Sequence, residues 1–178
     1  MRHSLTVTAL LLALAPAAAA AQATQPDLSD PEVAHVAVTA DNIDIAAGKV
    51  ALTRTHESDV KNFASMMVRD HTGVNDKAVA LAKKLGVTPK DNAVSQSLEA
   101  GAKEAKAKLD PLKGADFDRA YIEREIAYHQ GVLDALDQTL IPTTENAELK
   151  ALLTQVRPAI EAHLAYAKKI AEKLHAST

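Results

Sequence analysis

Apolar residues recur along this chain at alternating spacings of three and four, the repeat that lines them up on one face of an α-helix. Four long segments show such a face, and none shows the sustained alternation of a β-strand. The predicted helices end near residues 55, 85, 141 and 174 and begin at the N-caps Asp30, Ser58, Asp116 and one of Thr143, Thr144 or Asn146. The four apolar faces are Val33, Val36, Ala40, Ile43, Ala47 and Val50; Val60, Ala64, Met67, His71, Val74, Ala78, Leu81 and Leu85; Ile122, Ile126, His129, Leu133, Leu136 and Leu140; and Leu149, Leu153, Val156, Ile160, His163, Ala167, Ile170 and Leu174.

Glycine and proline mark the ends of these helices. Gly86 follows the second helix where a left-handed C-cap is expected, and Pro89 prevents continuation. Pro142 ends the third main helix in the same way. The joint after the first helix is short, which makes the first two helices antiparallel neighbours. Pro158 lies inside the last helix and should kink it one turn before His163.

A further helix is predicted between main helices two and three. It starts at Thr88–Asp91, with Asp91 closing a capping box, and stops at Asp110–Pro111. Its apolar residues are sparse, so we expect it to pack outside the other four helices. If it runs back along the bundle, it makes the long crossover typical of ferritin-like topology. The predicted fold is therefore all-α: a ferritin-like four-helix bundle with an additional connecting helix, forming one domain over residues 30–178.

The first residues have the pattern of a targeting signal. A weakly basic start, a short apolar run over residues 5–14 and an alanine-rich end predict a secretory signal peptide over residues 1–23. Residues 24–29 are expected to be a flexible leader. Because the later segments are too polar to span a bilayer, we expect a mature protein without a transmembrane segment. The sequence thus predicts export to the periplasm, and association with the outer membrane is compatible with it.

Composition removes several classes of function. Cysteine is absent, which excludes zinc–thiolate sites, iron–sulfur clusters and cysteine nucleophiles. The formal net charge is −3 without a basic patch, and tryptophan is absent, so no nucleic-acid partner is expected. Glycine-rich phosphate loops and nucleophile elbows are also missing from the sequence. No catalytic residue is predicted.

Three histidines fall on the apolar faces near the middle of their helices: His71, His129 and His163. Midpoints of similar helices share one level of a bundle, so the three imidazoles should meet, with Asp44 approaching at the same height. Glu125 lies one turn before His129 on the same face. Imidazole and carboxylate without thiolate suit zinc, copper, iron or manganese. The competing interpretation is a buried polar network that only fixes helix register.

Other candidate ligands fit less well. The Glu-x-x-His pairs of di-iron bundles occur here only as Glu32/His35 and Glu172/His175, at the extreme ends of helices. A ferroxidase centre is therefore not predicted. Met67 lies on the apolar face and is expected to fill the core rather than bind copper(I). Asp70 should point toward a neighbouring helix edge or solvent.

The stretch from Val60 to Thr72, with its Met67-Val68-Arg69-Asp70-His71 element, resembles the signature of domain-of-unknown-function family 4142. The likeness extends to residues 117–122, 128–130 and 158–163. The resemblance implies an exported bacterial protein with a ferritin-like helical bundle and implies no established activity. The chain departs from many relatives in having Asp44 in place of glutamate and Tyr128 before His129, with Glu125 added one turn earlier.

Two hypotheses about function follow. In the first, the histidine and carboxylate residues bind a transition metal, and the protein serves in metal handling or envelope stress. In the second, it is a non-catalytic structural or interaction protein of the periplasm. Peripheral association with the envelope and formation of a homo-oligomer are compatible with both.

Overall fold

A computed structural model describes residues 27–176, which contain five long helices and no strand. The predicted signal peptide and most of the predicted leader lie outside these residues. A π-helical turn over Leu136–Leu140 and a short α5, Ile141–Thr143, directly follow α4. The long helices are α1 (Asp30–Arg54), α2 (Ser58–Leu85), α3 (Ala93–Leu109), α4 (Gly114–Ala135) and α6 (Ala147–Ala176).

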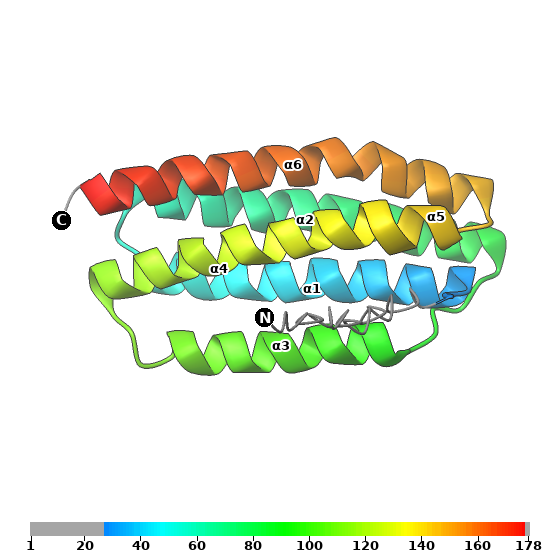
Figure 1. The fold of residues 1–178 in the computed structure, drawn as a ribbon, viewed down its shortest axis with the longest axis horizontal. Helices are drawn as coiled ribbons and strands as arrows, with labels where there is room; N and C mark the ends of the chain where they lie inside the picture. The colour runs from blue at the N-terminus through cyan, green and yellow to red at the C-terminus, as the bar shows by residue number, and fades with distance from the viewer. Residues whose placement is uncertain (1–26, 177–178) are drawn as a thin grey trace, which may run out of the picture.

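Four of these helices form a bundle, and the fifth lies outside it. Figure 1 shows α1, α2, α4 and α6 aligned along one long axis, with α3 running beside α1. Helix α2 reverses the direction of α1, and α3 returns along the bundle, so α4 runs in the same direction as α2. The prediction of a connecting helix between main helices two and three is therefore confirmed.

The start of α1 differs by one residue from the prediction. Ser29, not Asp30, is the N-cap, and its backbone N and Oγ donate to Glu32 Oε2 over 3.0 and 2.6 Å. The Asp30 carboxylate instead accepts hydrogen bonds of 2.9 Å from the backbone N atoms of Glu145 and Asn146. Asp30 thus ties the loop before α6 to the start of α1.

Other predicted helix starts also need correction. Glu57 precedes α2 as its N-cap, so Ser58 is already helical. Helix α3 begins later than predicted, because Asn92 Oδ1 accepts from the backbone N atoms of Val94 and Ser95. Asp116 lies within the first turn of α4, which starts at Gly114.

Two predicted caps are confirmed. Asn146, one of the three candidates, caps α6 by accepting from Glu148 N and Leu149 N at 3.0 Å each. Gly86 ends α2 with φ 65°, the left-handed conformation that glycine adopts most readily. Helix α6 continues through Pro158 to Ala176.

Helix α1 buries a different face from the one predicted for its second half. Ile43, Ala47 and Val50 are only partly buried and line a groove beside α3. The fully covered positions include Asp44 and Ala51, each 0% exposed, and the buried Gly48. A Cβ on Gly48 would lie 3.1 Å from the backbone O of Ala64, which shows how closely α1 approaches α2.

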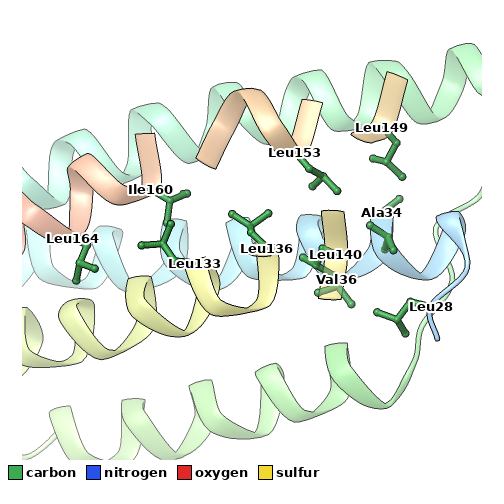
Figure 2. Close-up of a cluster of buried hydrophobic side chains, with 11 residues drawn as sticks. Leu28, Ala34, Val36, Leu133, Leu136, Leu140, Leu149, Leu153, Ile160 and Leu164 are labelled. Atoms are coloured by element: carbon green, nitrogen blue, oxygen red, sulfur yellow. The ribbon is translucent and has the colours of Figure 1, made fainter. Parts of the chain in front are cut away.

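The apolar core has two parts, one at each end of the bundle. The first, around Leu136, Leu153 and Ile160, joins α1, α4 and α6 (Figure 2). The second is built on large side chains that are at most 1% exposed, including Phe63, Met67 and Tyr121. Met67 is therefore a core residue, as predicted. The polar residues described next lie between these two parts along every helix of the bundle.

Candidate metal centre

Each helix of the bundle places polar side chains at mid-length in the core. None of these side chains belongs to a residue more than 6% exposed. We call them the histidine–carboxylate cluster: Asp41 and Asp44 from α1, His71 from α2, Glu125 and His129 from α4, and His163 from α6. The five residues predicted from the sequence are thus brought together, and Asp41 joins them.

The three imidazole rings pack against one another. One nitrogen from each of His71, His129 and His163 lies within 4.8 Å of a nitrogen of the other two. The ring centroids are 5.4–5.7 Å apart, and the rings are tilted or edge-on rather than stacked. The rings thus bring one nitrogen each to the same small region of the core.

One nitrogen of each ring is held by an oxygen outside the group of rings. His71 Nδ1 lies 2.7 Å from Asp41 Oδ1, and His129 Nδ1 lies 2.9 Å from the backbone O of Glu125. His163 Nε2 lies 3.2 Å from Asp70 Oδ2. Because these oxygens accept, the nitrogens facing them carry the protons, and in each neutral ring the opposite nitrogen has a free lone pair.

Those opposite nitrogens have no hydrogen-bond partner among residues 27–176. They are His71 Nε2, His129 Nε2 and His163 Nδ1. Asp44 Oδ2, also without a hydrogen bond in this part of the chain, lies 3.1 Å from His71 Nε2 and 4.0 Å from His129 Nε2. The site therefore gathers free acceptor atoms in a place where water is largely excluded.

Arg124 balances the buried carboxylates from one side. Its Nη1 donates to Asp44 Oδ1 over 3.0 Å and also to Glu125 Oε1. The guanidinium carbon lies 4.2 Å above the ring centre of Tyr128, whose hydroxyl donates to the backbone O of Ala40 over 2.8 Å. Burial disfavours the cation, but Glu125 and Asp44 raise the pKa of Arg124 above its ordinary value and keep it charged.

The pKa values of the two carboxyl groups that contact Arg124 are shifted in opposite directions. Burial, and then the negative charge of Asp44, raise the pKa of Glu125 well above its usual value. Burial opposes ionisation of Asp44 as well, but its interactions with His71, His129, Glu125 and Arg124 together outweigh burial and lower the pKa of Asp44. Asp44 is therefore the carboxyl group of the pair that ionises more readily.

The pKa values of the three histidines are also shifted in different directions. Burial disfavours protonation of His71, but Asp41 and Asp44 outweigh it and raise the pKa of its imidazole. Burial lowers the pKa of His129 to about 4. Burial, followed by the charge of His71, lowers the pKa of His163. At neutral pH, His129 and His163 are therefore neutral donors of lone pairs.

Sequence reasoning missed Asp41, Arg124 and the role of Asp70. Asp41 lies three residues before Asp44, a spacing that places both on one helix face and could have revealed it. Arg124 gives no such signal, because its partner Asp44 lies on another helix. Asp70 does point to a neighbouring helix, as one of the two predicted orientations, and meets His163 there.

The Glu-x-x-His pairs lie outside the cluster, as expected. Glu32 accepts from Ser29 and pairs with Lys90 at 3.2 Å. The side chain of His175 is 60% exposed near the end of α6. Two groups of residues within 27–176 have the geometry to hold a metal ion: His71, His129 and His163, and Asp44, Glu125 and His129.

Comparison with known proteins identifies the family. A family model described as Domain of unknown function (DUF4142) matches residues 15–170. The chain belongs to this family. The match includes the whole histidine–carboxylate cluster of this DUF4142 protein. No curated protein and no solved structure showed significant similarity to the chain. Within residues 27–176, no helix combines the length and apolar character needed to cross a membrane.

Proposed function

We propose that this DUF4142 protein binds one divalent transition-metal ion through His71, His129, His163 and Asp44. The remaining members of the cluster, Asp41 and Glu125, and the neighbouring Asp70 support these ligands. Asp41 orients His71, and Asp70 orients His163. Glu125 orients His129 through its backbone carbonyl and holds Arg124 through its side chain.

The observation that carries the proposal is the set of free lone pairs. Three imidazole nitrogens and one carboxylate oxygen are buried without a hydrogen bond inside the described chain. Leaving such a group unsatisfied costs about 1–3 kcal/mol each. A cation satisfies all four at once, whereas a purely structural network would be expected to pair them with one another or with backbone groups.

The ligand set narrows the type of metal. Three neutral imidazoles and one carboxylate, without sulfur, suit zinc, copper(II), iron(II) or manganese(II). Arg124 holds Asp44 Oδ1 and Glu125 Oε1, so these oxygens are already neutralised by a cation. The arrangement therefore supports one metal ion rather than a pair.

The N-terminal sequence and the order of the helices support a proposal for the fold, location and role of the protein. We propose that the fold is ferritin-like, that the chain is exported to the periplasm, and that it handles a metal ion there or acts in envelope stress. The signal-like N-terminal segment supports export. The returning α3, which lets α4 run parallel to α2, supports ferritin-like topology.

Metal analysis of untagged protein tests the proposal. Because the cluster is buried, the protein should be unfolded with a chelator and refolded with zinc, copper(II), iron(II) or manganese(II) in turn. After desalting, we expect about one equivalent of one of these metals and a higher melting temperature. His129→Gln should lose the metal, and a second variant, His163→Gln, should lose it as well.

His175→Gln is the matched control, since this histidine lies at the surface and should leave binding unchanged. If none of the four metals remains bound and none changes the melting temperature, the proposal of metal binding is wrong. The histidines would then serve as a polar network, and His71→Leu would be tolerated.

A further inference from the structure

A cavity of about 90 Å³ lies beside the histidine–carboxylate cluster. It lies between α1, α2, α4, α6 and the π-helical turn in the half of the bundle where α6 begins, and it is partly open to the surface. Its inner end reaches Asp41 and His71, and its outer end reaches Leu149 and Asn146. Figure 2 shows part of the wall, where Leu136, Leu140, Leu149, Leu153 and Ile160 point between the helices.

The wall of this cavity is apolar between its two ends. Alanine, valine, leucine and isoleucine side chains form the middle of it. At the outer end, the Asp30 carboxylate already accepts from Glu145 and Asn146. The Tyr128 hydroxyl already donates to Ala40. Water needs two to four polar partners to occupy a cavity, so the middle of this one should be dry.

The part of α2 that lines the cavity is less buried than the part on the other side of His71. Val74, Leu81 and Leu85 lie on the predicted apolar face of α2 and line the cavity, but they are only half-buried. On the other side of His71, Val60 and Met67 of the same helix are 0% exposed. The π-helical turn contributes Leu136 and Leu140 to the cavity, and such turns are frequent at functional sites.

We propose that this cavity binds a small uncharged apolar molecule, represented by dioxygen, and holds it beside His71. The apolar wall favours such a molecule over water or an ion. The bound molecule must be smaller than benzene, because cavities that admit benzene measure about 150 Å³ and this one measures about 90 Å³. The importance of this binding rests on the proposed function, because a gas molecule in this cavity lies next to the residues that would hold the metal.

Dioxygen itself provides the test, because it is paramagnetic and speeds the relaxation of nearby nuclei. Metal-free protein with labelled methyl groups is compared by NMR under dioxygen and under nitrogen. Methyl groups of Leu136, Leu153 and Ile160 should show much larger relaxation enhancement than those of Ile122 and Ile170. The five residues are all buried, at 0–5% exposed, so burial alone predicts no difference.

Ala78→Leu tests the position of the molecule, because Ala78 lines the cavity and a larger side chain should fill it. This variant should lose the excess relaxation at Leu136 and Leu153. Ala151→Leu makes the same change at an exposed site on α6, and this variant should retain the excess relaxation at Leu136 and Leu153. If Ala78→Leu does not fold, Leu153→Ala enlarges the cavity and should increase the enhancement at Leu136 and Ile160.

Equal enhancement at all buried methyl groups, or an excess that neither Ala78→Leu nor Leu153→Ala changes, would overturn the proposal. Since these measurements use metal-free protein, they are independent of metal retention. A protein that binds dioxygen but no metal would disprove the proposed function alone. A protein that retains metal without preferential relaxation would disprove the cavity alone.

Discussion

Arg124 and Asp44 form a buried ion pair that joins α4 to α1 at the centre of the bundle. Arg124 Nη1 lies 3.0 Å from Asp44 Oδ1, and the Asp44 residue is 0% exposed. The guanidinium therefore supplies one positive charge inside the protein and leaves Asp44 Oδ2 directed to His71. The ion pair sets both the charge of the cluster and the number of oxygens available to a metal.

Replacing Arg124 with methionine should destabilise the metal-free protein strongly. The change leaves the carboxyl groups of Asp44 and Glu125 buried without their cation, and breaking such a pair costs about 3–5 kcal/mol. Urea unfolding measures the loss. Arg157→Met is the control, since the Arg157 pair with Asp137 and Glu161 is exposed to solvent and should matter far less. Equal losses in the two variants would contradict the role given to Arg124.

Replacing Asp41 with asparagine should weaken metal binding without changing its stoichiometry. Asp41 Oδ1 accepts from His71 Nδ1 over 2.7 Å, and losing such a supporting carboxylate typically costs 10–100-fold in affinity. The same change should lower the pKa of His71 in the metal-free protein, because a charged acceptor is removed. Competition with a chelator and an NMR titration measure these effects. Asp134→Asn, at an exposed site on α4, should alter neither.

Metal affinity should fall as the solution becomes acidic. Binding requires neutral His71, whose pKa is raised above the ordinary value of 6.5. His129 does not compete, because burial lowers its pKa to about 4. A proton on His71 therefore opposes the metal already near neutral pH, and affinity should decrease from pH ~8 to pH ~6. Chelator competition across this range checks the trend, and a flat profile would exclude His71 as a ligand.

Gly73 within α2 and Gly86 at its C-cap should respond to alanine in opposite directions. Gly86 has φ 65°, so Gly86→Ala should destabilise the protein by about 1 kcal/mol. Gly73 lies in the exposed interior of the same helix, and a Cβ there meets nothing within 4 Å. Gly73→Ala should therefore stabilise the protein by about 1 kcal/mol. Urea unfolding measures both changes, and stabilisation by Gly86→Ala would show that the end of α2 is not formed as described.

The sequence predicted the convergence of the histidines because helical periodicity carries that information. His71, His129 and His163 each occupy an apolar position at mid-helix, and helices of similar length place their midpoints together whichever way they run. Periodicity does not predict which atoms of these side chains face one another. They depend on side-chain rotamers and on partners from other helices, such as Arg124 for Asp44 and Asp70 for His163.

The face of α1 shows where periodicity misleads. Ile43, Ala47 and Val50 fit the expected repeat, but α3 covers that side and the bundle receives Asp41, Asp44 and Gly48 instead. Burying two aspartates is acceptable only because His71 and Arg124 meet them there. A pattern that assigns apolar residues to the core cannot detect such compensation across helices.

The burial of the cluster determines when a metal ion could reach it. Its candidate ligands are at most 5% exposed, and the neighbouring cavity is lined by apolar side chains that would strip an ion of its hydration. An ion would enter readily only while the four helices are still apart. The protein would then keep the metal that was present where its chain folded, so the site of folding would select the ion as much as the ligands do.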